Sequence, residues 1–430
     1  RDDDVVRAAE AKAAEAAPGA TDDQAIRSAE TPSEQPVGST ELPRARTDSG
    51  PEARILSFLL AQALRDRATD VHIEPLEDRL RVRFRIDGGL REVNQLPRDM
   101  SSAFASRVRA LAAMGRDERQ GRLVVRAEDG DAAFDVSMLA TLWGEKIVLR
   151  ALERTTVAPD IESLGMESGV LERWRELLKS PYGLLLVAGL PGAGKTATLY
   201  ASLRELDSAS KDLTTVEDPI ARPLDGTTQV PVDRASGQPF AAAVRAALTQ
   251  EPDVLLVGEL RDRETADVAM NAALAGRLIL SSIQAPDALA AISRLLGLGA
   301  DAYLASASLV AVLAQLLVRR LCEHCRVVTK PSMLEAALLR QAGLPDDRVW
   351  IARGCARCSG TGYRGRASVF ELLIPNEELR SAIERGASIE EAREIASRAG
   401  LVTLRDAGLR LVADGSTSAQ EILSRLRASG

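Results

Sequence analysis

The sequence predicts an α/β protein of several domains, and three observations lead to this prediction. The chain has 430 residues, whereas one domain usually contains about 100–200. Apolar residues make up 45% and charged residues 27% of the chain, which is ordinary for a globular protein. Between residues 183 and 318, apolar strand patterns alternate with helical ones. This alternation is typical of a mostly parallel sheet covered by helices.

Residues 1–54 are predicted to be a disordered, mobile linker. They contain no aromatic residue, and their Ile, Leu and Val residues are confined to Val5, Val6, Ile26, Val37 and Leu42. Such a segment cannot bury enough apolar area to offset the entropy lost on ordering. The chain opens with Arg-Asp-Asp-Asp and has neither an initiator Met nor a secretory signal, so we expect a fragment or a processed chain.

Residues 55–153 are predicted to form a smaller α/β domain. Over residues 80–86, apolar residues alternate with arginines, which is the period-two pattern of a half-buried strand. The turn Asp87-Gly88-Gly89 closes this strand. The other expected elements are helices at residues 55–68 and 102–114 and strands at residues 70–75, 123–126, 133–139 and 146–152.

A phosphate-binding loop is the clearest motif of the chain. The apolar strand pattern of residues 183–188 leads into a segment, residues 189–196, that fits G-x-x-x-x-G-K-[ST]. In this motif consecutive backbone N–H groups cradle phosphates, the lysine reaches the β- and γ-phosphates, and the Ser/Thr hydroxyl binds Mg²⁺. The alternative is a chance glycine-rich turn. We predict that the nucleotide is bound by Gly189, Gly192, Ala193, Gly194, Lys195, Thr196 and Ala197, with Thr196 as a magnesium ligand.

Two further strand patterns, the first of them apolar, end in acidic residues. Glu259 follows the run of residues 254–258, and Glu217 and Asp218 follow the run of residues 214–216. Because the carboxyl ends of parallel strands meet at one edge of a sheet, we expect these acids beside the phosphate loop. Glu259 is expected to polarise water there. We therefore predict Glu259, Glu217 and Lys195 as catalytic residues, with a solvated loop acid as the alternative for each carboxylate.

The four cysteines of the chain form two C-x-x-C pairs, Cys322 with Cys325 and Cys355 with Cys358. Two such pairs are typical of a closed, structural Zn²⁺ site. Redox-active thiols are the alternative, but the first pair lacks the βαβ context of that class. The absence of other cysteines indicates a reducing compartment. His324 lies inside the first pair and is expected to be exposed.

Charge and composition argue against two other classes of protein. The net charge is −7 and aromatic residues make up 3% of the chain, whereas nucleic-acid binding usually requires a basic surface. The longest uncharged stretch, residues 302–318, has 17 residues. A membrane-spanning helix needs about 20 apolar residues, so this stretch is predicted to be a buried helix.

These elements, in this order, resemble the GspE/PulE/PilB family of type II secretion and type IV pilus assembly ATPases. The resemblance covers residues 55–428 and rests on five motif segments, at residues 68–75, 83–88, 215–220, 251–266 and 354–371. It implies a RecA-like P-loop ATPase domain at residues 154–318, preceded by the smaller α/β domain. It also implies a tetracysteine zinc-binding subdomain at residues 319–366 and a C-terminal helical subdomain at residues 367–430.

The resemblance also implies a function. A member of this family is an ATP-hydrolysing motor subunit that works with Mg²⁺ and a structural Zn²⁺. It forms a cytoplasmic homo-hexamer that is peripheral to the inner membrane. Its partners are inner-membrane platform proteins and cytoplasmic-membrane adaptor proteins, it binds no nucleic acid, and it reaches the membrane only through these partners. The resemblance does not separate secretion from pilus assembly.

Four of the positions at which the chain departs from the family pattern lie in the predicted ATPase domain. Two family histidines are replaced by Arg277 and Gln284, a glutamate by Ala221, and an arginine by Thr249. A Gln side chain donates and accepts hydrogen bonds much as a neutral histidine does, and Arg277 is expected to place a positive charge near the phosphates. Two functions remain open: an active ATPase whose turnover is reduced, and a weakly hydrolysing subunit that regulates or scaffolds an assembly.

Overall fold

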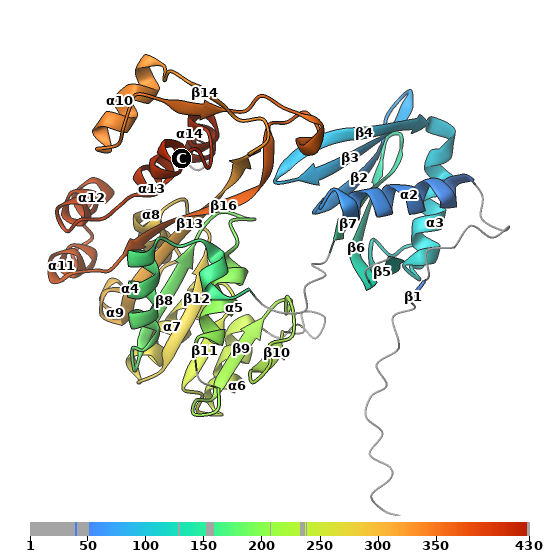
Figure 1. Ribbon diagram of the computed structural model, residues 1–430. Helices are drawn as coiled ribbons and strands as arrows, with labels where there is room; N and C mark the ends of the chain where they lie inside the picture. Colours follow the sequence, from blue (N-terminus) through green and yellow to red (C-terminus); the bar gives the residue numbers. More distant parts are fainter. Residues whose placement is uncertain are drawn as a thin grey trace, which may run out of the picture.

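The structure is a computed structural model that describes residues 39–40, 51–127, 130–151, 159–206, 208–232, 237 and 239–427. The described residues form two seven-stranded sheets and a small two-stranded sheet. Figure 1 shows the first large sheet with α2 (Pro51–Arg65) and α3 (Ser101–Leu111) as one lobe, and the second large sheet with its covering helices as another. None of the described helices is long and apolar enough to cross a membrane.

The N-terminal sheet is antiparallel, apart from one short parallel pair at its edge. Leu80, Val82 and Phe84 are buried, and the arginines between them lie on the opposite face. Helices α2 and α3 contribute side chains to the same core. The strands, in spatial order, are β1 (Ser39–Thr40), β5 (Gln120–Ala127), β6 (Gly130–Thr141), β7 (Gly144–Ala151), β2 (Asp70–Pro75), β3 (Arg79–Ile86) and β4 (Gly89–Pro97), and η1 (Arg98–Met100) precedes α3.

The N-terminal lobe corrects three sequence-based expectations. Helix α2 begins at Pro51 rather than at residue 55, because proline is well suited to the first turn of a helix. Ser39 and Thr40 pair with β5 within the stretch predicted as a linker. Strand β4 was not predicted, because its polar and apolar residues do not alternate regularly. In the structure, the pairing of β4 with β3 contains a register shift. The rest of residues 1–50 lies outside the described residues.

The C-terminal sheet is the parallel sheet that the alternating pattern predicts. Its first six strands run parallel, and β16 joins the edge antiparallel to β13. All residues of β8, β11 and β12 are buried, as expected for a sheet covered on both faces. The strands, in spatial order, are β10 (Thr228–Pro231), β9 (Leu213–Glu217), β11 (Val254–Val257), β12 (Leu278–Ile283), β8 (Gly183–Ala188), β13 (Leu309–Leu321) and β16 (Tyr363–Leu373).

Two layers of helices cover this sheet. Side chains of α4 (Ser168–Leu178) and α5 (Lys195–Arg204), together with η2 (Ile161–Leu164), share one core with one face of the sheet. The other face belongs to a second core, to which the remaining helices contribute. These helices are α6 (Phe240–Leu248), α7 (Arg263–Leu274), α8 (Ala288–Gly297), α9 (Ala302–Ser308), α10 (Met333–Gln341), α11 (Glu377–Glu384), α12 (Ile389–Arg398), α13 (Leu404–Ala413) and α14 (Ala419–Arg427).

The uncharged stretch at residues 302–318 is not one buried helix, as the sequence suggested. It forms α9 and then most of β13, which lies between β8 and β16. An uncharged, mostly apolar run does not distinguish a buried helix from a buried strand by its periodicity. The predicted boundaries at 318/319 and 366/367 consequently fall inside β13 and β16. The cysteine region is an insertion between these two paired strands, and it contains β14 (Val327–Thr329), α10, β15 (Val349–Ile351) and η4 (Ala356–Cys358).

Candidate nucleotide and metal sites

The phosphate loop lies between the end of β8 and the start of α5, which is the place that the motif requires. Gly192 and Gly194 have φ angles of 78° and 92°, in the left-handed region that glycine adopts without strain. Helix α5 begins at Lys195, so its positive N-terminal end faces the loop. The backbone geometry is therefore suited to an anion.

A buried glutamine holds this loop in place. The Gln315 side chain, in β13, is 3% exposed. Its Nε2 donates to the Ala193 carbonyl at 2.6 Å, and its Oε1 accepts from the Thr198 hydroxyl at 2.7 Å. One amide thus fastens the phosphate loop and α5 to the neighbouring strand. Sequence reasoning missed Gln315, although a lone polar residue inside an apolar strand is a signal of this kind.

A cavity of about 440 Å³ opens beside the loop at the carboxyl edge of the sheet. Lys195 and Thr196 line it, and Glu259 and Gln284 line it from the ends of β11 and β12. Lys195 Nζ donates to the Gly189 carbonyl at 2.8 Å. Burial lowers the pKa of Lys195, while the charge of Glu259 acts in the opposite direction. A phosphate entering the cavity would supply the negative charge that this buried cation lacks.

Glu259 is engaged by a neighbouring cation. Its Oε2 accepts from Arg261 Nε at 2.5 Å, and Arg261 Nη1 lies 3.8 Å from Asp218 Oδ2. The Glu259 side chain is 12% exposed, whereas that of Arg261 is 53% exposed. The guanidinium is thus the more exposed partner, and solvent lies next to it on the side away from the carboxylate.

Glu217 lines the same cavity, but both of its oxygens accept hydrogen bonds. Tyr200 donates to Oε2 at 2.7 Å and Thr215 donates to Oε1 at 2.8 Å. Burial and the contact with Glu217 raise the pKa of Tyr200, whose hydroxyl accepts in turn from the Ala221 N–H at 3.3 Å. This arrangement suits a carboxylate that positions its neighbours better than one that transfers protons.

The four positions that depart from the family pattern do not share one location. Ala221 and Gln284 line the cavity. Thr249 is exposed at the end of α6, where its hydroxyl bonds to the Ala246 carbonyl.

Arg277 precedes β12 at the opposite edge of the sheet, and its carbonyl accepts from Gly183 N at the start of β8. A six-residue strand spans about 20 Å. The expectation that Arg277 places a charge near the phosphates is therefore wrong within one chain, because Arg277 and Gln284 flank opposite ends of β12.

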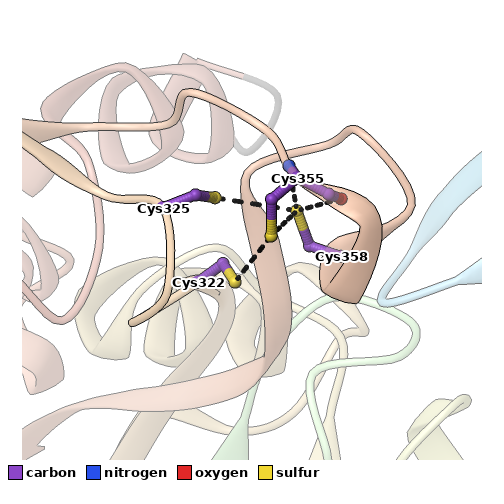
Figure 2. Close-up of side chains that lie close together, drawn as sticks. All are labelled: Cys322, Cys325, Cys355 and Cys358. Atoms are coloured by element: carbon purple, nitrogen blue, oxygen red, sulfur yellow. Dashed lines mark hydrogen bonds between the residues drawn. The ribbon is translucent and has the colours of Figure 1, made fainter.

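The four cysteines come together between the ends of β13 and β16 (Figure 2). The sulfur–sulfur distances are 3.9 Å for Cys322 and Cys355, 3.7 Å for Cys325 and Cys358, and 3.7 Å for Cys355 and Cys358. A tetrahedral Zn²⁺ with Zn–S bonds of about 2.3 Å places its sulfurs about 3.8 Å apart. Both the donor set and its spacing therefore fit Zn²⁺.

The backbone around Cys358 favours a thiolate. The N–H groups of Cys355 and Gly362 donate to its sulfur at 3.2 and 3.1 Å. Burial acts against ionisation, but these donors lower the pKa of Cys358 to about 6. His324 is exposed, and its Nδ1 lies 3.3 Å from Arg357 Nη1. It takes no part in the sulfur cluster.

Known proteins are similar to this chain in sequence and in fold. Residues 45–424 match the family model described as "Type II/IV secretion system protein". The chain is 39% identical over 380 residues to the type II secretion system protein HxcR of Pseudomonas aeruginosa, a match that covers 87% of this chain and 77% of that protein. It is also 39% identical over 387 residues to the type IV pilus assembly ATPase PilB of Thermus thermophilus.

The match to PilB covers 88% of this chain but 43% of that longer protein. Among solved structures, the X-ray structure of the Legionella pneumophila ATPase DotB superposes with a TM-score of 0.64 at 18% identity, covering 91% of this chain and 99% of that one. At this sequence identity, the structural similarity supports a shared fold and nothing more. The family model, by contrast, spans most of the sequence, and the chain therefore belongs to the type II/IV secretion system protein family.

Proposed function

We propose that this chain is an ATP-hydrolysing motor subunit that powers type II protein secretion or type IV pilus assembly. The observation that carries the proposal is the shared cavity of Lys195, Thr196 and Glu259 at the carboxyl edge of the C-terminal sheet. A phosphate-binding cation, a metal-binding hydroxyl and a carboxylate are the parts that P-loop nucleotide hydrolysis needs. Relatives named for both machines match the chain over most of its length.

In the proposed reaction, the N–H groups of the phosphate loop and Lys195 bind the β- and γ-phosphates. Lys195 leaves the Gly189 carbonyl, to which it now donates, when phosphate oxygens replace it. The Thr196 hydroxyl holds Mg²⁺, which bridges the phosphates and offsets the charge of the transition state. Gly194 and Ala197 complete the loop and the first turn of α5.

Glu259 orients and polarises the attacking water in this proposal. Its carboxylate is available for this task once Arg261 releases it, and the exposure of Arg261 allows that movement. Gln284 contacts the γ-phosphate or the water from the end of β12 through its amide. Glu217 positions Tyr200 and the segment before Ala221 rather than exchanging protons itself.

We further propose that turnover is slower than in relatives with a histidine at position 284. Removing one preorganised hydrogen bond to a transition state typically costs about 3 kcal/mol, or roughly a hundredfold in rate. Gln284 recovers part of such a loss because an amide still donates. Ground-state binding is preserved, because the phosphate loop is complete.

The proposed assembly is a cytoplasmic homo-hexamer at the inner face of the membrane. Platform and adaptor proteins of the secretion or pilus machine are its partners and convert its domain movements into export or fibre extension. The Zn²⁺ held by the four cysteines is structural, because four thiolates leave no open coordination position.

Steady-state ATPase measurement on the assembled protein tests the proposal. Lys195→Ala should abolish nucleotide binding, whereas Glu259→Gln should keep binding and remove turnover. A wild-type protein that binds ATP but hydrolyses it no faster than Glu259→Gln would refute the motor and favour a purely nucleotide-holding subunit. A protein that binds no nucleotide would refute the site itself.

A further inference from the structure

A buried carboxylate that the proposed reaction does not use lies in β16. Glu371 stands inside an otherwise apolar segment, residues 369–373, and is 3% exposed. Among the described residues no cation forms an ion pair with it, and Arg393, whose charge acts on it, lies 3.9 Å from Asp287 instead. Burial raises the pKa of Glu371. A buried polar group of this kind needs hydrogen-bond partners.

The starts of two helices supply these partners. One carboxylate oxygen accepts from Ala288 N, at the start of α8, at 2.9 Å, and the other accepts from Leu404 N, at the start of α13, at 2.8 Å. The N-terminal end of a helix carries unpaired N–H groups and a partial positive charge, so both ends suit an anion. One side chain of β16 thus ties together the first turns of two helices that are far apart in the sequence.

The first of these helices follows closely on Gln284. Strand β12 ends at Ile283 and α8 begins at Ala288, so residues 285–287 connect Gln284 to the helix. Gln284 lines the nucleotide cavity, but its exposed side chain makes no hydrogen bond to another described residue. The position of its amide therefore depends on how the backbone is held on either side.

The sheet holds one side of this connection, and Glu371 holds the other. Strand β12 pairs with β8 along its whole length, up to the residue before Gln284. After Gln284, the ring of Pro286 fixes one backbone angle of the short connection. The hydrogen bond from the start of α8 to Glu371 then sets where the connection ends. A displacement of the helix start is consequently passed to Gln284 over three residues.

We propose that Glu371 is a positioning residue for ATP hydrolysis, which holds the start of α8 against β16 and thereby keeps the Gln284 amide in place at the nucleotide. The inference rests on the proposed function, because it assigns a role within that reaction. A group that meets a transition state is effective when it is held in position beforehand. Loosening Gln284 therefore lowers the rate of hydrolysis rather than the affinity for the nucleotide, which the phosphate loop supplies.

The test is a double-mutant cycle on kcat, measured with the assembled protein. Glu371→Gln keeps the shape of the side chain, but its NH₂ group cannot accept from a helix start. It should lower kcat at least fivefold and leave KM for ATP within twofold. In a Gln284→Ala background the same change should lower kcat by less than twofold, because the amide that Glu371 positions is already absent. An unchanged kcat for Glu371→Gln, or an equal loss in both backgrounds, would overturn the proposal.

Two further variants separate positioning from a general loss of stability. Asn376→Ala is the matched control, because it removes the cap of α11, where Asn376 accepts from Leu379 N at 2.9 Å. It should leave kcat within twofold. Pro286→Gly loosens the connection after Gln284 and leaves Glu371 in place, so it should lower kcat even if Glu371→Gln folds poorly. A kcat of Pro286→Gly at the wild-type level would count against the proposal and overturn it.

Amide hydrogen exchange provides a readout that does not require turnover. Glu371→Gln should speed exchange at the first turns of α8 and α13 together, whereas Asn376→Ala should speed it at α11 alone. Unchanged exchange at α8 would overturn the role of Glu371. If the wild-type protein hydrolyses no ATP, the motor proposal fails, and exchange at α8 still decides whether Glu371 holds the connection to Gln284. The two failures are therefore distinguishable.

Discussion

Gln315→Met is the sharpest test of how the phosphate loop is held. Methionine has nearly the length of glutamine but offers no strong hydrogen-bonding group. The change leaves the Ala193 carbonyl and the Thr198 hydroxyl without their partner, both in buried surroundings. Each buried polar group that loses its partner costs about 1–3 kcal/mol.

The expected loss of unfolding free energy is about 2–4 kcal/mol, because a threonine hydroxyl in a helix can bond instead to a backbone carbonyl of the preceding turn. The loop also loses the bond that fixes its geometry before the nucleotide arrives. Nucleotide affinity should therefore fall at least tenfold, or about 1.4 kcal/mol, since part of the binding energy is spent on ordering the loop.

Urea unfolding and nucleotide titration of the same protein measure the two effects. The double variant Gln315→Met with Thr198→Val should be less destabilised than the sum of the single variants, because the second change removes one of the orphaned groups. Gln341→Met, at an exposed glutamine on α10, is the control and should shift stability by less than about 0.5 kcal/mol. If Gln315→Met matches that control in both assays, the buried clamp has no energetic role and the reasoning fails.

Three further outcomes are expected. Purified protein should contain one zinc per chain, and a zinc content well below one would contradict the site. Cys322→Ala should lower the zinc content and should loosen the insertion more than it weakens nucleotide binding. Gln284→His should raise kcat with little change in affinity, whereas Arg277→His, at the other end of β12, should leave kcat unchanged; equal effects would contradict the separation of the two positions. Glu74→Gln should destabilise the protein by about 1–3 kcal/mol at pH 7. Burial acts against ionisation, but hydrogen bonds from Arg83 and Lys146 lower the pKa of Glu74 to about 2. The stabilisation by the Glu74 carboxylate is therefore complete above pH 4.5 and is lost as the pH falls toward 2. A stability difference between Glu74→Gln and wild type that persists in full at pH 2 would contradict this prediction.

The parts of the site that the sequence could predict are those fixed by local geometry. A strand followed by G-x-x-x-x-G-K-[ST] and a helix leaves one place for the loop, and β8 and α5 flank it as expected. The carboxyl ends of parallel strands share an edge, so the approach of Glu259 to Lys195 follows from strand direction alone. The cysteine pairs likewise converge, with 29 residues between Cys325 and Cys355.

The parts that the sequence could not predict depend on which strands become neighbours. Gln315 touches the loop because β13 lies next to β8, and the mostly apolar, uncharged stretch around it did not indicate that a strand begins at residue 309. The distance of Arg277 from the loop required knowing at which end of β12 it stands.

Strand β13 joins the two candidate sites along one element. Gln315 holds the phosphate loop from the interior of the strand, and Cys322 follows its last residue, Leu321. The seven steps from Gln315 to Cys322 span about 23 Å in an extended strand. Strand β13 pairs with β8 as far as Ala314 and with β16 from Val312 to Leu321, so the part beyond Gln315 is held by β16 alone. The cysteine cluster closes the insertion directly beyond the pair formed by Leu321 and Tyr363, so a metal bound there keeps β13 and β16 in register. The strand that carries Gln315 is thus held by β8 before this residue and by β16 beyond it, and stabilising the second pairing is the structural role that we propose for a metal bound to the four cysteines.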